Sequence, residues 1–99
     1  MTNRFEIRRA TRDDAQTLAR FNSAMAMETE GKCLIAERVL AGVHGLLEKP
    51  ELGFYLVATH EGRVAGSLMV TYEWSDWRCG VFWWVQSVYV VPEFRRQGV

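Results

Sequence analysis

The 99-residue sequence predicts an α+β domain in which a mostly antiparallel, four-stranded sheet carries two helices. Three observations lead to this prediction. A short alternating segment opens the chain, two segments with helical spacing of apolar residues follow it, and β-branched and aromatic residues dominate three later segments. The expected order is strand, helix, helix, strand, strand, strand, within one domain that spans residues 1–99.

The first predicted strand leads into the first helix through a capping signal. Phe5 and Ile7 alternate with charged residues, as in a half-buried strand. Thr11 then offers a hydroxyl group, and Asp14 follows at the spacing that a capping box requires. Apolar residues continue at steps of three and four, so an amphipathic helix is expected over residues 12 to about 27.

The first helix is expected to end in the polar segment ETEGK, Glu28–Lys32, with Gly31 as its stop signal. A second helix is predicted after this break, because Val39, Val43 and Leu46 form an apolar stripe at helical spacing. A proline and a glycine a few residues later mark its end.

The second half of the chain predicts a hairpin and then a long strand. Residues 54–72 hold two β-rich runs around the turn residues HEGR. Gly66 in the second run indicates a bulge or a close backbone approach. The polar stretch EWSDWRCG is expected to connect the hairpin to VFWWVQSVYVV, residues 81–91. That run lies between Gly80 and Pro92 and is expected to be a central strand with apolar side chains on both faces.

Composition excludes several classes of partner and location. Twelve basic residues balance twelve acidic ones, so no nucleic-acid or membrane partner is expected. The longest apolar stretch, Val81–Val85, is far shorter than the roughly 18 residues of a membrane helix, and the first ten residues lack the apolar core of a secretion signal. Cys33 and Cys79 match no metal-ligand spacing, which predicts reduced thiols, no metal and a cytoplasmic location.

The last eight residues, PEFRRQGV, have the chemistry of a phosphate-binding loop. Pro92 cannot donate a hydrogen bond and therefore fixes the end of the strand. Arg95 and Arg96 supply forked donors that match phosphate oxygens, and Gly98 lets the backbone approach a ligand closely. Successive main-chain N–H groups at a helix start bind anions. A solvated turn has a similar composition, so spacing alone leaves both interpretations open.

The segment VQSVYVVPEFRRQGV, residues 85–99, resembles the acetyl-coenzyme A signature of the GNAT N-acetyltransferases. In that family a long fourth strand and a proline precede the pattern Arg or Gln-x-x-Gly-x-Gly or Ala. The predicted order of elements matches the family as well. The resemblance implies the amino-terminal portion of the GNAT fold, incomplete at its carboxyl end. The motif's second glycine or alanine, the helix after it and the tyrosine that often acts as general acid would lie beyond Val99.

The resemblance also implies a reaction, in which the acetyl group of the co-substrate acetyl-coenzyme A moves to a primary amine by direct attack. Backbone groups of the strand would pair with the pantetheine arm, and main-chain N–H groups of the loop would face the diphosphate. An N–H near Val88 or Val90 would stabilise the oxyanion of the tetrahedral intermediate. The residues implied in cofactor binding are Val88, Tyr89, Val90, Arg95, Arg96, Gln97, Gly98 and Val99.

The acceptor side departs from the family pattern. An acidic residue early in the last strand commonly helps to deprotonate the amine, but Gln86 and Ser87 stand at these positions, and glutamine cannot accept a proton. The carboxylates that could serve as the base instead are Glu28, Glu30, Glu73 and Asp76. Glu28 and Glu30 would lie on the same side if ETEGK is extended, although a solvated polar loop is the alternative.

Strand alternation divides the last strand into two predicted faces. Trp84 and Gln86 share one face, whereas Trp83, Ser87 and Tyr89 share the other. Candidate substrate contacts are Trp74, Trp84 and Gln86. Core packing is the alternative for the strand tryptophan, and an interface role is the alternative for the tryptophans in the EWSDWRCG connection.

The resemblance therefore predicts an N-acetyltransferase that acts on a small-molecule or peptide amine and forms a homodimer, with the 99-residue chain alone inactive. A second hypothesis is a non-catalytic module that self-associates through an uncovered sheet face, because large exposed apolar patches usually mark association sites. A third is a regulatory domain that binds coenzyme A without turnover.

Overall fold

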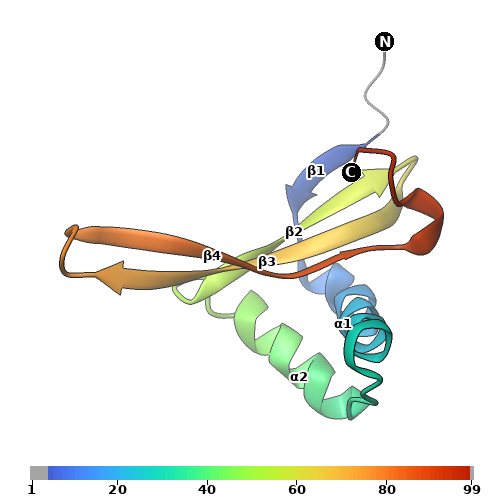
Figure 1. The fold of residues 1–99 in the computed structure, drawn as a ribbon, viewed down its shortest axis with the longest axis horizontal. Coiled ribbons are helices and arrows are strands. Elements are labelled where there is room, and N and C mark those ends of the chain that lie inside the picture. Colours follow the sequence, from blue (N-terminus) through green and yellow to red (C-terminus); the bar gives the residue numbers. More distant parts are fainter. Residues whose placement is uncertain (1–4, 99) are drawn as a thin grey trace.

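The computed structural model describes residues 5–98, and its elements follow the predicted order (Figure 1). The strands and helices are β1 (Glu6–Arg9), α1 (Ala15–Glu30), α2 (Ala36–Leu47), β2 (Gly53–His60), β3 (Arg63–Ser75) and β4 (Gly80–Val90), with single 3-10 turns η1 (Arg12–Asp14) and η2 (Pro92–Phe94). The four strands form one antiparallel sheet in the order β1-β2-β3-β4. The predicted α+β fold class is confirmed.

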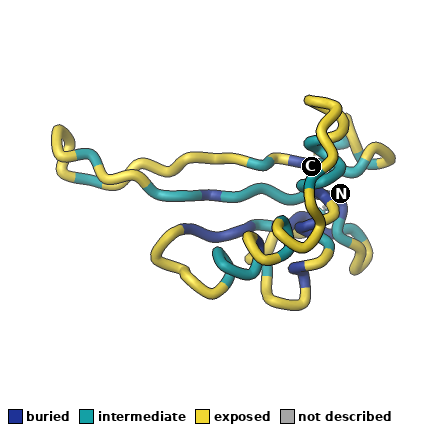
Figure 2. Tube along the Cα trace, turned by 90° about the horizontal axis from the view of Figure 1, so that it is seen from below, coloured by how far each residue is buried: buried dark blue, intermediate teal, exposed yellow. Residues whose placement is uncertain are grey.

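Both helices lie on the same side of the sheet, as Figure 2 shows. Their apolar stripes pack on β2, where Tyr55 and Val57 point toward the helices. Leu18 of α1, Val43 of α2 and Val57 of β2 are the largest fully buried side chains of the described chain. Removing each from water stabilises the fold by about 1.5–3 kcal/mol. The core is therefore a single layer between two helices and one sheet face.

The capping signal at the start of α1 is confirmed. The Asp14 carboxylate accepts a hydrogen bond from the Thr11 N–H at 2.8 Å, and the Arg8 guanidinium of β1 donates to both Asp14 oxygens at 2.8 and 3.0 Å. The hydrogen bonds from Arg8 hold the pKa of Asp14 below its ordinary value. This contact ties the first strand to the first helix.

The predicted stop at Gly31 is confirmed, but the helix runs three residues beyond its expected end near residue 27. α1 continues through Glu30 and ends at Gly31, whose φ of 63° places it in the left-handed region, and the Gly31 N–H donates to the carbonyl of Met27 at 3.0 Å. Glu28 and Glu30 therefore lie in a helical turn rather than an extended segment. Residues two apart point in directions about 200° apart around a helix axis, so the two carboxylates do not share a side. No helix breaker precedes Gly31, which explains the difference.

Strand β3 runs further than predicted, to Ser75, and together with β4 it forms an arm that extends beyond the helices (Figure 1). Half of the expected polar connection EWSDWRCG is strand, because Trp74 pairs with Val81 and the turn is confined to residues 76–79. β4 was also predicted to be central. It lies at the edge of the sheet, and no other described strand pairs with its outer side.

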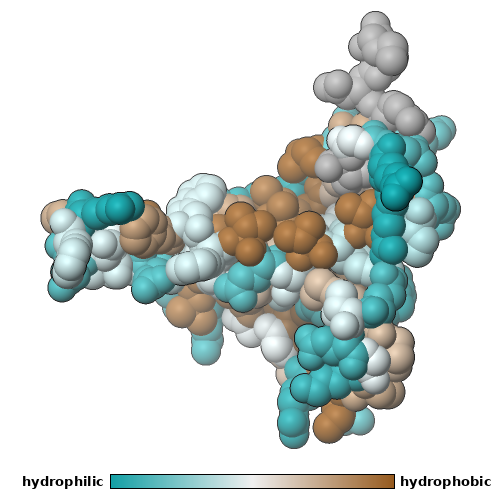
Figure 3. Space-filling model, in the orientation of Figure 1, coloured by the Kyte–Doolittle hydropathy of each residue, from teal (hydrophilic) through white to brown (hydrophobic). Residues whose placement is uncertain are grey.

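The second face of the sheet carries no helix, and apolar side chains gather on it over β3 and β4 (Figure 3). Ile7, Trp83, Val85 and Val88 are each more than half exposed on this helix-free face. Ile7 was expected in a half-buried strand, but all four residues of β1 are exposed because β1 is the other edge of the sheet. Among the described residues, no helix has the length and apolar character needed to cross a membrane.

Candidate functional site

A break in the regular pairing of β4 organises the candidate site. Ser67 of β3 pairs with Tyr89 and Met69 pairs with Gln86, so two β4 residues, Ser87 and Val88, stand opposite one β3 residue. Ser87 has a φ of 52°, which is uncommon for a residue other than glycine. This is a β-bulge, a device that bends a strand and redirects its side chains.

The bulge shifts the alternation of side chains by one residue. Tyr89 therefore faces the helices, where its ring lies 5.0 Å from that of Phe21 on α1. Ser87 points to the same side, whereas Trp83 faces the helix-free side and packs against Phe54. The prediction that Ser87 and Tyr89 share a face with Trp83 is wrong, because strict alternation ends at the bulge. Gln86 and Trp84 share a face, as predicted, and Gln86 donates to Thr71 at 2.6 Å.

Main-chain groups beyond the bulge face the open edge of the sheet. The Val91 N–H donates inward to the carbonyl of Ala65 at 2.8 Å. Antiparallel alternation then turns the N–H and C=O groups of Val90, and the N–H of Val88, outward. The Val90 carbonyl accepts a hydrogen bond from Arg95 Nε at 2.8 Å on that outer side. The close backbone approach expected at Gly66 is confirmed, since a Cβ there would lie 2.8 Å from the main-chain carbonyl oxygen of Tyr89.

The loop after β4 has a backbone shape that favours anions. Pro92 opens η2 and ends the strand, as predicted. Arg96 and Gly98 have φ values of 62° and 82°, while Gln97 between them does not have a positive φ. Alternation of this kind makes successive N–H groups converge into a concave nest that binds anions. Between described residues, the N–H groups of Arg96 and Gly98 make no backbone hydrogen bond. Val99 lies outside the described residues.

The loop is joined to α1 through Glu28. Its carboxylate accepts hydrogen bonds from Arg95 at 2.8 Å and from the Tyr89 hydroxyl at 3.1 Å. The Arg95 guanidinium also lies over the Tyr89 ring, 5.4 Å from its centroid. The hydrogen bond from Arg95 holds the pKa of Glu28 below its ordinary value, and the hydrogen bond from Tyr89 has a smaller effect in the same direction. Burial, reinforced by Glu28, raises the pKa of the Tyr89 hydroxyl.

A hollow of about 590 Å³ lies between the helices and the bulge of β4. This helix-side hollow is lined mainly by α1, the segment after it, and α2: Asn22, Met25, Ala26, Thr29, Glu30, Lys32, Leu34, Val39, Gly42, Val43, Tyr55, Met69 and Ser87. Tyr55 is buried and shares a hydrogen bond with Asn22, and burial raises the pKa of its hydroxyl. Of the predicted carboxylates, Glu30 alone lines this hollow among the residues described.

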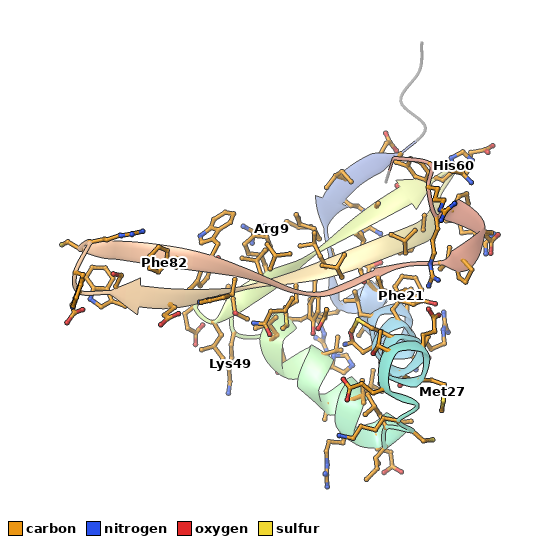
Figure 4. All side chains as sticks on the ribbon, viewed as in Figure 1. Arg9, Phe21, Met27, Lys49, His60 and Phe82 are labelled. Carbon is orange, nitrogen blue, oxygen red and sulfur yellow. The ribbon has the colours of Figure 1, made fainter. Side chains whose placement is uncertain are left out.

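The structure does not bring the remaining acceptor candidates to the helix-side hollow. Glu73 lies on the β3–β4 arm and accepts a hydrogen bond from Trp84 Nε1 at 2.5 Å. Trp74 is exposed on the same arm, and Trp77 at its tip is 95% exposed. Figure 4 shows Phe82 on this arm, distant from Phe21 of α1. The predicted cofactor loop, the helix-side hollow and the arm thus lie in separate regions of the structure.

Sequence reasoning missed several residues that line the hollow. Asn22 and Tyr55 line the hollow and share a hydrogen bond, but nothing in the sequence distinguishes them from other helix and strand residues. Ser87 was predicted only to stand where the family has an acidic residue. Its positive φ was not predicted, because serine rarely adopts a left-handed backbone. Lys32 belongs to the ETEGK segment, whose two glutamates were predicted as candidate bases, and its charge was the available signal.

The model of the GNAT acetyltransferase family matches residues 9–99. The chain belongs to this family. No significant match was found among curated proteins. The chain's GNAT membership agrees with the position of its motif, since the strand, the bulge and the loop with Arg95 and Gly98 lie together inside the matched region.

Solved structures resemble this GNAT chain over nearly its whole length. A "possible acetyltransferase" from Clostridium difficile 630 is 49% identical, has a TM-score of 0.92, and aligns with 97% of this chain and 63% of its own. An integron cassette protein from the mobile metagenome of Cole Harbour Salt Marsh is 26% identical, with a TM-score of 0.86 and coverages of 93% and 60%.

A "predicted acetyltransferase with acetyl-CoA" from Clostridium acetobutylicum shares 14% identity and a TM-score of 0.77, over 96% of this chain and 65% of its own, which supports the fold alone. This GNAT chain thus spans about 60 to 65% of the length of these three structures.

Proposed function

We propose that the chain forms the acetyl-coenzyme A-binding portion of a GNAT enzyme that transfers an acetyl group to a primary amine. The observation that carries this proposal is the backbone from Val88 to Gly98. Outward main-chain groups of Val88 and Val90 provide one strand edge, and the nest at Arg96–Gly98 follows it after a single turn. An extended pantetheine arm and a diphosphate require such an edge and such a nest in this order.

The proposed roles of the two arginines differ. Arg95 is held by Glu28 and the Val90 carbonyl, so it fixes the loop against α1 and β4. Arg96 is exposed and makes no ion pair within the described part of the chain, so its guanidinium is available to a phosphate. The main-chain N–H groups of Arg96, Gln97 and Gly98 contribute the nest itself, with Val99 next along the chain.

The proposed reaction is direct attack by the neutral amine on the thioester, with no acyl-enzyme intermediate. Outward N–H groups at Val88 and Val90 stabilise the developing oxyanion. Glu30 is the proposed base, since it lines the hollow that Ser87 also lines. Glu28 is a weaker candidate because its ion pair with Arg95 lowers its pKa, and Glu73 lies on the arm away from the hollow.

Calorimetry with acetyl-coenzyme A tests the proposal. Gly98→Ala adds a Cβ that meets no atom within 4 Å, yet the φ of 82° is unfavourable for alanine, so the variant changes the nest without a clash. Gly62→Ala is the matched control, with a φ of 80°, equally open space and a position in the β2–β3 turn. We expect Gly98→Ala to weaken binding about tenfold and Gly62→Ala to leave it unchanged. Absence of binding to the unmodified chain, or equal losses in both variants, would contradict the proposal.

The helix-free face favours the second candidate function, a non-catalytic module that self-associates. Trp83, Val85 and Val88 expose apolar surface on one face beside an unpaired strand edge, and both features promote association. Light scattering over a range of protein concentrations tests this idea. A dimer that Val85→Lys converts to a monomer would support self-association, whereas a monomer at all concentrations would exclude it.

A further inference from the structure

We infer that the helix-side hollow selects an amine that also carries a carboxylate on an apolar body, as a free amino acid does. This inference rests on the proposed function, because it names the acceptor of the same transferase. Three features of the hollow support it: the two charged side chains, the apolar lining and the position next to β4. They indicate, in turn, the charged groups, the body and the orientation of the ligand.

The hollow has one lining side chain of each charge, and both are available. Glu30 belongs to the last turn of α1 and Lys32 follows the left-handed Gly31. Neither makes an ion pair with another described residue, whereas Glu28 in the same turn is fully engaged by Arg95 and Tyr89. A carboxylate beside Lys32 and an ammonium beside Glu30 would compensate both charges. A simple alkylamine would leave Lys32 without a counter-charge.

The remaining lining fits an apolar body between these groups. Met25, Leu34, Val39, Val43 and Met69 all contribute apolar lining. Methionine side chains adapt to ligands of different shape because they are unbranched and polarisable. A volume of about 590 Å³ lies within the usual range for small-molecule sites. The lining therefore favours an apolar amino acid over a sugar or a polyamine.

The position of Ser87 orients the bound amine. Ser87 lies at the β4 bulge, next to the outward main-chain groups proposed to hold the thioester. An ammonium beside Glu30 would share the hollow with Ser87 of that strand, while the carboxylate stays at Lys32. Loss of a proton from the ammonium to Glu30 then leaves a neutral nitrogen for attack.

NMR titration of the 99-residue chain with three matched probes tests the inference. The probes are phenylalanine, phenethylamine, which lacks the carboxylate, and 3-phenylpropionate, which lacks the amine. We expect phenylalanine to shift the backbone amides of Lys32, Leu34 and Ser87 and to bind about fivefold more tightly than the other two, since one exposed ion pair contributes up to about this factor. The titrations contain no acetyl-coenzyme A, so failure of the transferase proposal does not affect their outcome.

Variants identify the two charges. Lys32→Met should lower the affinity for phenylalanine about fivefold and leave phenethylamine unchanged, and Glu30→Gln should weaken phenylalanine without weakening 3-phenylpropionate. Lys49→Met is the matched control, because Lys49 is exposed beyond the end of α2 and does not line the hollow (Figure 4). Equal affinities for phenylalanine and phenethylamine, an equal effect of Lys32→Met on both, or no shifts at the hollow would each overturn the inference.

Discussion

The two halves of β4 have similar composition and opposite environments. In the carboxyl-terminal half, Tyr89 is 8% exposed, packs on Phe21 and donates a hydrogen bond to Glu28. In the amino-terminal half, Trp83 is 63% exposed and Trp84 is 54% exposed. α1 lies beneath the carboxyl-terminal half, whereas the amino-terminal half extends past both helices as part of the arm (Figure 1).

This difference shows that strand composition does not decide burial in this chain. The position of the helices decides it, and the bulge at Ser87 decides which side chains point toward them. A buried ring gains free energy from burial and contacts, whereas an exposed ring on a two-stranded arm gains little. The half of β4 that carries the proposed cofactor edge is therefore the half that packs against α1.

Alanine substitutions along β4 give the largest expected effect. Tyr89→Ala should lower the free energy of unfolding by about 3–5 kcal/mol, because it removes a buried ring from contact with Phe21. Trp83→Ala should cost less than about 1.5 kcal/mol, since the ring is mostly exposed and loses chiefly its contact with Phe54. Urea unfolding of both variants measures the difference. Similar losses would mean that the arm is packed as firmly as the site.

The sequence predicted the elements well because their signals are local. The capping residues Thr11 and Asp14, the stop at Gly31 and the strand end at Pro92 each act on neighbouring backbone, and all four are found where expected. The candidate phosphate loop was also predicted from a local segment, together with the family resemblance. Its residues are contiguous, and their backbone requirements can be stated from residue type.

The errors arose where distant parts of the chain meet. The contacts of Glu28 with Tyr89 and Arg95 join residues 61 and 67 positions apart, and no local pattern predicts them. The bulge at Ser87 depends on how β4 pairs with β3 rather than on the residue itself. The hydrogen bond between Asn22 and Tyr55 in the hollow likewise joins a helix to a strand. Tertiary packing determined these features.

Acid should release the loop from α1 through Glu28, with an effect smaller than loss of the Tyr89 ring. Arg95 lowers the pKa of Glu28, so the ion pair contributes fully above the ordinary value of 4.5 and is lost as the pH falls below it. NMR titration should show the amide resonances of Tyr89 and Arg95 moving together with a midpoint below 4.5. In Glu28→Gln this shared transition should be absent.

Glu30→Gln is the matched control for the acid titration, since Glu30 lies in the same helical turn and makes no contact with Arg95 among those described. The control should keep the transition at Tyr89 and Arg95. If Glu30→Gln abolished the transition and Glu28→Gln did not, Glu30 rather than Glu28 would anchor the loop, which would contradict the prediction. The amide of Trp83 should not show the transition shared by Tyr89 and Arg95, because Trp83 lies on the arm and has no contact with Glu28 among those described.

The smallest effect is expected at the tip of the arm. Trp77 is 95% exposed in the turn between β3 and β4, so Trp77→Ser should change the free energy of unfolding by no more than about 0.5 kcal/mol. Urea unfolding at low protein concentration measures this, and tryptophan fluorescence should lose a solvent-exposed component. A destabilisation that grows with protein concentration would show that a second copy covers the tip. That result would mean that the arm is buried in an assembly, as Tyr89 is buried in the single chain, and it would support the self-association hypothesis.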